Sequence, residues 1–487
     1  MTKLTGRLLP VLSGVLLAIA FPPAGLSALA WIALVPLLAA VQRASPARAF
    51  VRGLVTGVVF RVLSMSWLAA MLHNYTGASW PVSIGVFSLL AIYLAAYTGL
   101  FTWSIALAPK QLGARGLLIA PFSWAAVEYA NERVLTGFHW LPLAASQSEH
   151  LNLIQIAEFT GTYGVSFLIV LGNTAACFLL KRLFKKDGGP SWRWTGAVAA
   201  FALASAVGVW SWGLHRVKQL ESEWRGARKL RVRMVNPAVP QDVKWTPEYR
   251  GQALRDLATL SEKGSSRPDL VLWPEAAAPF NFEKDPFSAA AVRRLSSKLG
   301  APILFGAPGQ RVDKEGVAFT NSAWLLSPTG KILGRYDKRR LVPFGEYVPL
   351  RQLLPAVPAL ARGLAYADLS NGRGEPTIRL GNDRIGLLIC YEAVFEDLVR
   401  DAARKGAQVL VNLTNDAWLG RAGALQHLAM ARFAAIETRL PMVRVANRGV
   451  SALFAPSGRA RCVTAPERRA SVDCVIGLES RADPARR

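Results

Sequence analysis

Apolar residues dominate the first 215 positions of the chain and fall into separate segments. Each segment is close to the roughly 20 residues that cross a hydrocarbon core as a helix. The fifth segment is shorter and ends in charged residues, so its pattern is the weakest indication of a span. The pattern predicts a transmembrane helical domain over residues 1–220 with about seven spans, at 6–22, 25–42, 53–72, 81–108, 115–130, 160–180 and 195–214.

The pattern changes at about residue 229, where short β-rich runs begin to alternate with amphipathic helical ones. The runs LRVRMVN, DLVLWPE and RIGLLICYE are typical strands, and Leu254, Leu257 and Leu260 recur at helical spacing. Alternation of this kind is typical of sheets covered by helices. We therefore expect an α/β domain over 228–478, followed by a polar tail at 479–487.

The charges between the apolar segments predict the orientation of the chain. Lys and Arg cluster before the first span and then in every second loop, whereas the other loops are nearly free of them, Arg133 being the exception. Cytoplasmic loops carry this excess of positive charge. The amino terminus is therefore expected inside and everything after the seventh span outside. A cleaved signal peptide is the alternative for the first segment, and six further spans argue against it.

Composition agrees with a membrane protein, because 52% of the 487 residues are hydrophobic and only 18% are charged. The net charge of +25 raises the question of nucleic acid. The cations lie in short loops and form no basic stripe with interleaved aromatic residues, so nucleic-acid binding is not expected. The four cysteines have no metal-ligand spacing, and a Cys462–Cys474 pair stays open.

Several polar residues lie within or beside the apolar segments. Arg61 falls inside the third span, where snorkelling to the interface is favoured slightly over a contact inside the helical bundle. Glu128 and Arg133 lie where they can hold the bundle together, and His139 is interpreted as an interfacial hydrogen-bonding residue rather than a catalytic base.

Three reactive side chains each follow a predicted strand. Cys390 ends the apolar run 385–389, Glu275 follows a Trp-Pro turn, and Lys338 lies in a polar turn. Each has an ordinary structural interpretation: a core thiol, a turn carboxylate and a solvated cation. Together they can perform acyl transfer, because a carboxylate can take the thiol proton and an ammonium can stabilise an oxyanion. We therefore interpret them as one site.

The motifs WPE, YDK and CYE resemble the Glu-Lys-Cys signature of the nitrilase, or carbon–nitrogen hydrolase, superfamily. With VPQDVKW, LVPFGEYVPLR, NLTNDAWLG and the loop WAAVEYANER…GFHW, nearly the whole chain resembles the apolipoprotein N-acyltransferase family. The resemblance implies an αββα sandwich on the periplasmic face of a bacterial inner membrane. It also implies that Glu275 is the base, Lys338 the oxyanion stabiliser and Cys390 the nucleophile.

The same resemblance assigns supporting residues and partners. Glu346 is expected to support the site, Glu392 to lie beside the nucleophile, and Trp245 and Trp418 to lie where the acyl chain or substrate enters. The implied reaction moves an acyl chain from a membrane phospholipid, through a Cys390 thioester, to the α-amino group of a diacylglyceryl-cysteine. No metal or cofactor is expected, and the protein is expected to be a monomer.

Two rival functions stay open at this stage. A membrane-tethered nitrilase-type amidase would use the same three residues on small substrates, whereas a non-catalytic membrane scaffold would not need them.

Two further features come from the last part of the chain. The family normally closes with an eighth span, whereas this chain ends in RASVDCVIGLESRADPARR, which is too polar to cross a membrane. The segment 347–375 interrupts the strand pattern, and its apolar residues within 350–364 predict a lid that contacts lipid or moves to admit it. A loop packed onto its own domain is the alternative.

Overall fold

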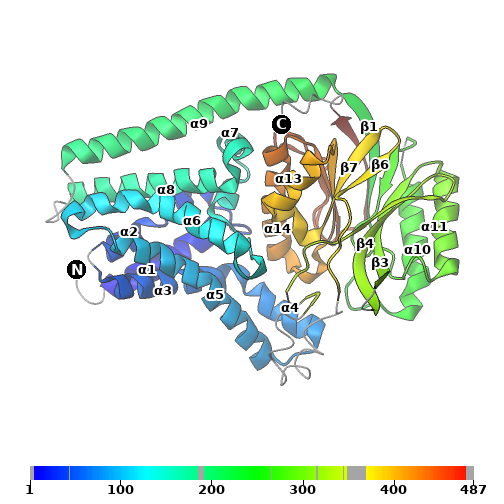
Figure 1. The fold of residues 1–487 in the computed structure, drawn as a ribbon, viewed down its shortest axis with the longest axis horizontal. Helices are drawn as coiled ribbons and strands as arrows, with labels where there is room; N and C mark the ends of the chain where they lie inside the picture. The colour runs from blue at the N-terminus through cyan, green and yellow to red at the C-terminus, as the bar shows by residue number, and fades with distance from the viewer. Residues whose placement is uncertain are drawn as a thin grey trace. The chain divides into compact units, whose positions relative to one another are not determined.

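The computed structural model describes residues 5–42, 44–184, 191–264, 266–313, 316–343, 345–347 and 369–478. The proposed lid at 350–364 and the tail at 479–487 lie outside these residues. The chain forms two compact units, a helical unit of Met1–Ala70 and Trp80–Val217 and a second unit of Met71–Ser79 and Lys218–Arg487. Figure 1 shows the elements of both.

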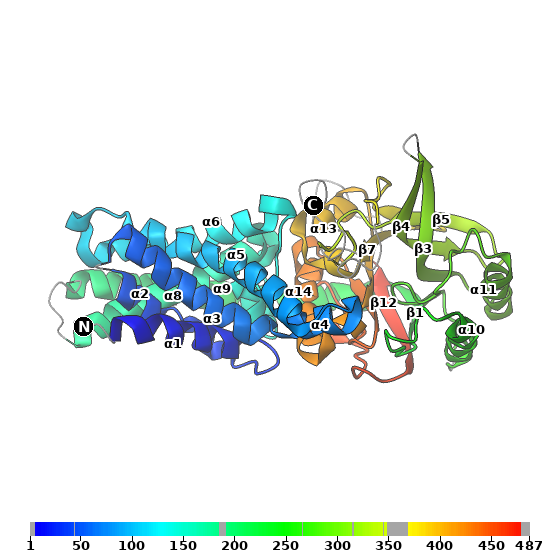
Figure 2. The ribbon, with the colours of Figure 1, turned by 90° about the horizontal axis from the view of Figure 1, so that it is seen from below.

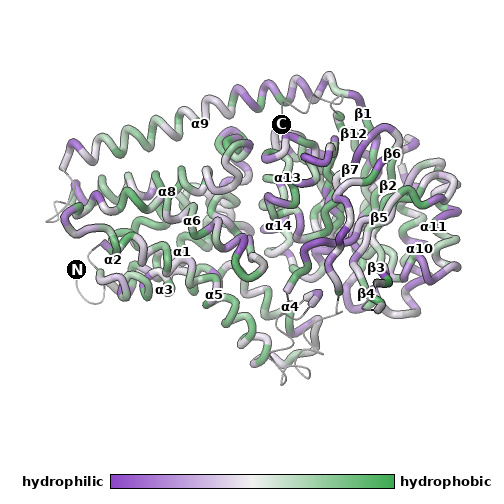
Figure 3. Tube along the Cα trace, in the orientation of Figure 1, coloured by the Kyte–Doolittle hydropathy of each residue, from purple (hydrophilic) through white to green (hydrophobic). Residues whose placement is uncertain are grey.

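The helical unit is built from apolar helices, which Figure 3 shows as predominantly hydrophobic. Its α-helices are α1 (Thr5–Ala20), α2 (Val35–Val41), α3 (Pro46–Met65), α5 (Trp80–Ala106), α6 (Ala120–Arg133), α7 (Leu151–Ile154), α8 (Ala157–Leu183) and most of α9 (Trp192–Gly226). Helix α4 (Trp67–Thr76) passes from this unit into the second. Short 3₁₀ turns lie at η1 (Ser27–Trp31), η2 (Lys110–Ile119), η3 (Val134–Thr136) and η4 (Leu143–Gln147).

Three helices in the described residues, α5, α8 and α9, are long and apolar enough to cross a membrane, and the bent pair α3–α4 makes up to four. The chain is therefore a membrane protein with several candidate spans, and the count of seven stays a prediction. The predicted segment 25–42 contains a 3₁₀ turn and the seven-residue α2. The predicted segment 115–130 begins in η2, where Gly113 has a φ of 52°.

Small residues let α3 and α5 approach closely. Gly53 and Gly57 lie one turn apart on α3, and a Cβ on Gly53 would come within 2.3 Å of the Thr98 carbonyl oxygen. A Cβ on Gly57 would come within 2.7 Å of the Ala95 Cα. Helices in lipid associate by this kind of close packing, because the hydrocarbon supplies no hydrophobic drive between them.

The second unit contains two six-stranded sheets, each partly parallel. The first has the order β12-β1-β2-β3-β4-β5 and the second β11-β10-β9-β8-β7-β6. Pairs β1–β2, β2–β3, β7–β8 and β8–β9 are parallel. The strands are β1 (Arg228–Asn236), β2 (Leu270–Leu272), β3 (Ile303–Asp313), β4 (Gly316–Leu326), β5 (Ile332–Asp337), β6 (Thr377–Leu380), β7 (Asp383–Ile389), β8 (Val409–Asn415), β9 (Met442–Asn447), β10 (Ala452–Phe454), β11 (Ala460–Arg461) and β12 (Ala470–Leu478).

Apolar side chains from both sheets meet in one core, which includes Leu272 and Leu304 of the first sheet and Leu387 and Leu413 of the second. Helices α10 (Pro247–Glu262) and α11 (Pro286–Leu299) cover the other face of the first sheet. Helices α13 (Glu396–Arg404) and α14 (Gly420–Thr438) cover the other face of the second, as Figures 1 and 2 show. The predicted αββα sandwich is therefore confirmed.

A disulfide joins the edges of the two sheets. Cys462 follows β11, the outer strand of the second sheet, and Cys474 lies on β12, the outer strand of the first. The pairing that the sequence left open is therefore present. Disulfides persist in oxidising compartments and are rare in a reducing cytosol.

Candidate active site

The two sheets bring the three strand-end residues into one cluster. Glu275 follows β2 and Lys338 follows β5, both of the first sheet, whereas Cys390 follows β7 of the second. Lys338 Nζ lies 3.6 Å from Glu275 Oε1, and both charges act on the Cys390 thiol. The structure thus brings together the three residues that sequence reasoning grouped.

Cys390 lies on a strained turn. Its φ of 55° is in the left-handed region, which costs a residue with a Cβ about 1–2 kcal/mol. The turn leads from β7 into the 3₁₀ turn η6 (Cys390–Val394). Asn412 of the neighbouring strand β8 donates its side-chain amide to the Cys390 carbonyl at 3.0 Å, which holds the turn in place. A sharp turn of this kind is a recurrent way to present a nucleophile.

Lys338 is buried among carboxylates. Its Nζ lies 2.9 Å from Glu346 Oε1, and the Asn321 side-chain amide donates to Glu275 Oε1 at 2.7 Å and to Glu346 Oε1 at 2.9 Å. Burial lowers the pKa of Lys338, but the Glu346 and Glu275 carboxylates raise it more, so that its pKa lies above the ordinary value. Lys338 is therefore a fixed cation, and Glu346 is its hydrogen-bonded carboxylate partner, while the supporting role of Glu346 stays a prediction.

The thiol of Cys390 is protonated at neutral pH. Burial and the Glu275 carboxylate raise its pKa to about 12, and the opposing effects of Lys338 and Thr414 are smaller. A thiol of this pKa is a weak nucleophile until a base removes its proton. Glu275 is the carboxylate whose charge acts most strongly on it, and the residue is 7% exposed.

Glu392 is completely buried and connects the Cys390 turn with the Lys338 turn. It accepts hydrogen bonds from the Ile389 backbone at 2.8 Å, from the Arg339 backbone at 2.6 Å and from the Tyr336 hydroxyl at 2.8 Å. The two turns belong to different sheets, so this one carboxylate fixes the distance between them. Its contacts indicate a positioning role.

The two tryptophans that the sequence singled out, Trp245 and Trp418, both belong to the second unit. Trp245 is half-buried, with the Lys244 ammonium 5.7 Å from its ring centroid. Trp418 ends the 3₁₀ turn η7 (Asp416–Trp418), and the ring of Tyr75 meets it edge-on at 4.9 Å. Their placement where substrate enters stays a prediction.

Sequence reasoning missed a second lysine at the site. Lys244 is 2% exposed, its Nζ donates to the Glu275 carbonyl at 3.2 Å, and its charge interacts with both Glu275 and Cys390. Burial lowers its pKa to about 8. The sequence feature that could have identified Lys244 is its position in the motif VPQDVKW, directly before Trp245.

A buried polar network behind Cys390 was missed as well. Arg444 on β9 donates to Asn412 Oδ1 at 2.9 Å and to Asp416 Oδ2 at 2.6 Å, and His427 Nδ1 lies 3.1 Å from Asp416 Oδ1. Asn412 in turn holds the Cys390 carbonyl. The signal was the polar residues within the otherwise apolar runs VLVNLTN and MVRVAN. Among the described residues, no group of three or more His, Cys, Asp or Glu side chains is arranged to hold a metal ion.

Comparison with known proteins adds an independent observation. Residues 13–175 match the apolipoprotein N-acyltransferase N-terminal domain, and residues 231–472 match the carbon–nitrogen hydrolase family. The apolipoprotein N-acyltransferase of Geobacter metallireducens is 37% identical over 94% of this chain and 86% of its own length. That of Chlorobaculum tepidum is 31% identical over 97% of this chain and 91% of its own length.

Among solved structures, a nitrilase-superfamily protein of Saccharomyces cerevisiae aligns with 51% of this chain and 90% of its own, at 20% identity and a TM-score of 0.40. An amidase from a Nesterenkonia species aligns with 52% of this chain and 91% of its own, at 19% identity and a TM-score of 0.36.

Proposed function

The chain belongs to the apolipoprotein N-acyltransferase family and is an N-acyltransferase, and we propose that it works through an acyl thioester on Cys390. The donor is a membrane phospholipid, and the acceptor is the α-amino group of a diacylglyceryl-cysteine at the amino terminus of an apolipoprotein. The observation that carries the proposal is the strained Cys390 turn, held beside a buried carboxylate and a buried ammonium.

The first half-reaction forms the thioester. Glu275 takes the proton of the Cys390 thiol, and the thiolate attacks the ester carbonyl carbon of the phospholipid. The ammonium of Lys338 stabilises the oxyanion, which is the role that a fixed cation can fill. The C–O bond of the ester then breaks, Glu275 returns its proton to the departing oxygen, and lysophospholipid leaves.

The second half-reaction uses the same groups. The α-amino group of the acceptor attacks the thioester carbonyl carbon, and Lys338 again stabilises the oxyanion. The C–S bond breaks as the C–N bond forms, and the amine loses a proton to Glu275. A carboxylate is available for this step because Glu275 gave up its first proton to the lysophospholipid.

We place the catalytic unit on the periplasmic side of the inner membrane. Two independent features support this side. The Lys and Arg residues alternate between loops in the way that puts residues after the seventh span outside. The Cys462–Cys474 disulfide fits an oxidising compartment.

Intact-mass measurement tests the covalent step. Incubated with phospholipid alone, the protein should gain the mass of one acyl chain, and hydroxylamine should release it. Cys390→Ala should gain nothing, whereas Cys177→Ala, which removes the other free cysteine, should gain it normally. A diacylated peptide with a free amine should discharge the adduct, and the same peptide with an acetylated amine should not.

Wild-type rates of peptide acylation by Cys390→Ala would overturn the covalent mechanism. An adduct that forms from small amides and not from phospholipid would favour an amidase instead.

A further inference from the structure

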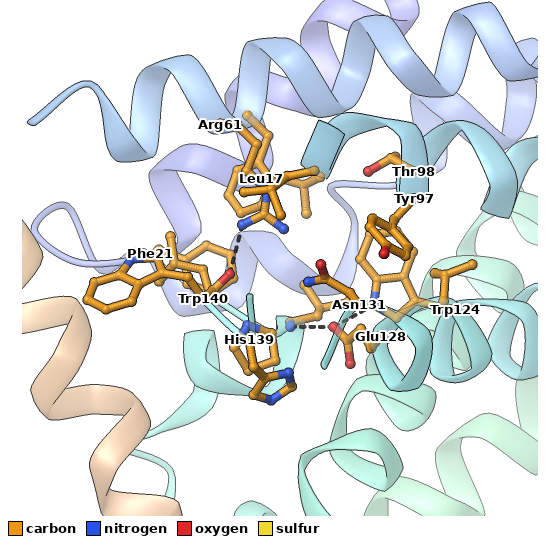
Figure 4. A pocket seen from close by; sticks show the side chains of 16 residues that line it. Leu17, Phe21, Arg61, Tyr97, Thr98, Trp124, Glu128, Asn131, His139 and Trp140 are labelled. Carbon is orange, nitrogen blue, oxygen red and sulfur yellow. Dashed lines mark hydrogen bonds between the residues drawn. The ribbon is translucent and has the colours of Figure 1, made fainter. Parts of the chain in front are cut away.

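Buried polar atoms without a hydrogen-bond partner occur in both units, and in the helical unit one of them lines a pocket with Arg61 (Figure 4). Arg61 is 9% exposed and donates to the Trp140 carbonyl at 2.8 Å, so it does not snorkel to the interface, contrary to the slight preference from the sequence. Asn131 Oδ1 accepts from no described residue. The enclosed space is about 30 Å³, which has room for about two waters. Water therefore suffices as the donor in this pocket.

The second unit contains a buried series of amide side chains. Asn447 ends β9, Asn415 ends the neighbouring parallel strand β8, and Gln241 lies in the segment between β1 and α10. Asn447 Nδ2 lies 2.9 Å from Asn415 Oδ1, and Asn415 Nδ2 lies 2.8 Å from Gln241 Oε1. All three residues are at most 5% exposed. We call these three side chains the amide relay.

Backbone groups fix the direction of each hydrogen bond in the amide relay. The Val239 N–H donates to Asn447 Oδ1 at 2.8 Å, and the Val239 carbonyl accepts from Asn447 Nδ2 at 2.9 Å. The Ala417 N–H donates to Asn415 Oδ1 at 3.4 Å. A backbone N–H can only donate, so neither asparagine amide can be turned over without losing these bonds. The last group of the relay, Gln241 Nε2, is therefore a donor.

Gln241 Nε2 has no acceptor among the described residues, although it is completely buried. The other end of the same amide, Oε1, already accepts from Asn415. An amide N–H loses its hydrogen bonds to water on burial, so an unpaired one is unfavourable, and the large majority of buried polar groups in folded proteins are paired. The unpaired donor therefore indicates an occupant that offers an acceptor oxygen.

The amide relay connects the segments that hold the nucleophile and the proposed base. On β8, Asn415 directly follows Thr414, whose side chain is hydrogen-bonded to the Cys390 thiol. The segment between β1 and α10 also carries Lys244, which donates to the Glu275 carbonyl at 3.2 Å. An occupant of the donor at the end of the relay is therefore a molecule bound at the reacting groups.

Of the two proposed substrates, the acceptor has a carbonyl at a fixed position. Its α-amino nitrogen must reach the carbonyl carbon of the thioester on Cys390, and the carbonyl of the same cysteine is separated from that nitrogen by one carbon atom. In the phospholipid, the reacting carbonyl oxygen faces Lys338 in the proposed mechanism, and the second ester is attached through a flexible glycerol. A donor that is fixed beside Cys390 therefore complements the cysteine carbonyl of the acceptor.

We propose that Gln241 determines the specificity for the acceptor by donating Nε2 to the carbonyl oxygen of its diacylglyceryl-cysteine. This subsite rests on the proposed function and adds a recognition step to it. An amine beside a carbonyl is thereby distinguished from a simple alkyl amine, which has no such oxygen and leaves Gln241 unpaired. Sites that hydrogen-bond a substrate group reject analogues without that group for this reason.

Binding to the full-length Cys390→Ala protein in detergent tests the subsite without any thioester. The two probes are diacylglyceryl-cysteine methylamide and diacylglyceryl-cysteamine, which has the same lipid and a primary amine but no carbonyl. The methylamide should bind with a Kd about tenfold lower, the scale of one buried hydrogen bond, and Gln241→Met should remove most of this difference. Gln252→Met should keep it, because this exposed glutamine of α10 pairs with Asp256. The ratio of the two Kd values is compared between variants, so the different basicity of the two amines cancels.

A second variant, Asn415→Asp, reverses the last amide of the relay without removing it. A carboxylate still accepts from Asn447 but cannot donate, so Gln241 turns its Nε2 toward this carboxylate and presents Oε1 to the substrate. The preference for the carbonyl should disappear here as well, although Gln241 is unchanged. Circular dichroism and thermal unfolding in detergent show whether each variant is folded.

Two outcomes would overturn the subsite and leave the donor of Gln241 to water. One is a Kd ratio near one in the Cys390→Ala protein, and the other is a preference that survives in folded Gln241→Met and in folded Asn415→Asp. The acyl mass on the wild-type protein reports on the thioester separately. Absence of that mass together with the expected Kd ratios would overturn the thioester mechanism and support the subsite.

Discussion

Two buried lysines, Lys338 and Lys244, interact electrostatically with Cys390, and their surroundings shift their pKa values in opposite directions. Lys338 has the Glu275 and Glu346 carboxylates within 4 Å, and its pKa lies above the ordinary value. Lys244 has a backbone carbonyl as its hydrogen-bond partner, and burial lowers its pKa to about 8. Lys338 is therefore a permanent cation, whereas Lys244 changes its charge within the pH range in which bacteria live.

The lowered pKa of Lys244 leads to a stability prediction. Lowering it from 10.5 to about 8 corresponds to about 3 kcal/mol against the charged form. Lys244→Met removes this cost and loses one hydrogen bond of about 1 kcal/mol, so it should raise the free energy of unfolding at pH 7 by about 2 kcal/mol. Turnover should nevertheless fall, because Nζ braces the Glu275 carbonyl.

The pH dependence of the free energy of unfolding tests this prediction for Lys244. Between about pH 8 and 10.5 the unfolded chain binds more protons at this lysine than the folded chain, so wild-type stability should rise with pH there. Thermal unfolding in detergent at several pH values measures this rise, which Lys244→Met should lack. A variant that is both less stable and equally active would contradict the assignment.

Removal of Glu275, the proposed base, or of Lys338, the fixed cation, should impair adduct formation in different ways. Lys338→Ala should slow acylation about 10²-fold or more, the scale of losing one oxyanion donor. Glu275→Gln should slow it strongly at pH 7 but recover in part at high pH, because the thiol, without the Glu275 charge that raises its pKa, then ionises without a base. Rapid-quench measurement of the acyl mass gives both rates. Glu275→Gln with an unchanged pH profile would exclude its role as base.

Strand-end reasoning found Glu275, Lys338 and Cys390 because each directly follows a recognisable strand. It could not find Lys244 or Asn321 in the same way. Their importance comes from contacts 31 and 46 residues away, with Glu275 in both cases. Whether a lysine is solvated or buried depends on how the sheets close over it, and local pattern does not contain that information.

At the scale of elements, β8 and β9 form a rigid support for the Cys390 turn. Asn412, Arg444 and Asp416 connect in series behind it, and all three are at most 2% exposed. Sheets covered by helices were predictable because short β-rich and helical patterns alternate from residue 229, whereas the αββα arrangement was implied by the family resemblance. The bounds of helices in the helical unit were less predictable, because a continuous apolar run such as 25–42 does not show where a 3₁₀ turn interrupts it.

Breaking the pair Arg444–Asp416 should be costly. Arg444→Met leaves the Asp416 carboxylate buried without its main counter-charge, which typically costs about 3–5 kcal/mol. Urea denaturation of the full-length protein measures the loss. Arg340→Met breaks a partly exposed pair with Asp397 and should cost about 1 kcal/mol or less.

The same pair predicts acid sensitivity. Burial raises the pKa of Asp416, but Arg444 and His427 lower it more, so its pKa lies below the usual value. Its stabilising effect is therefore present above the unfolded pKa of about 3.8 and is lost as the pH falls through the folded value. Arg444→Met should lose less stability on acidification than the wild-type protein. Equal losses would show that the pair contributes nothing to acid stability.

At the scale of the whole molecule, hydropathy and charge predict a membrane domain joined to an α/β domain, and the comparisons establish the family. Orientation depends on the count of spans, and by length and composition three, or up to four, helices of the described part of the chain qualify. The loops rich in Lys and Arg are the better guide.

Reporter fusions test the orientation. A reporter that is active only in the periplasm should be active when fused after Leu478 and inactive when fused after Leu183, which precedes a basic loop. A reporter that is active only in the cytoplasm should give the opposite pattern. Cytoplasmic activity after Leu478 would mean that the orientation or the number of spans is wrong.

The burial of Glu275 and Lys338, at 7% and 1% exposure, has a consequence for the lifetime of the acylated enzyme. In the proposed mechanism, the acyl chain must wait, once lysophospholipid has left, for a lipoprotein that arrives by diffusion in the membrane. Water is far more abundant than that acceptor, and each hydrolysed thioester releases a fatty acid without product. A site in which Glu275 and Lys338 are shielded from solvent limits this hydrolysis of the thioester. The ratio of free fatty acid to acylated peptide, measured as acceptor becomes scarce, would show how long the enzyme can hold its intermediate.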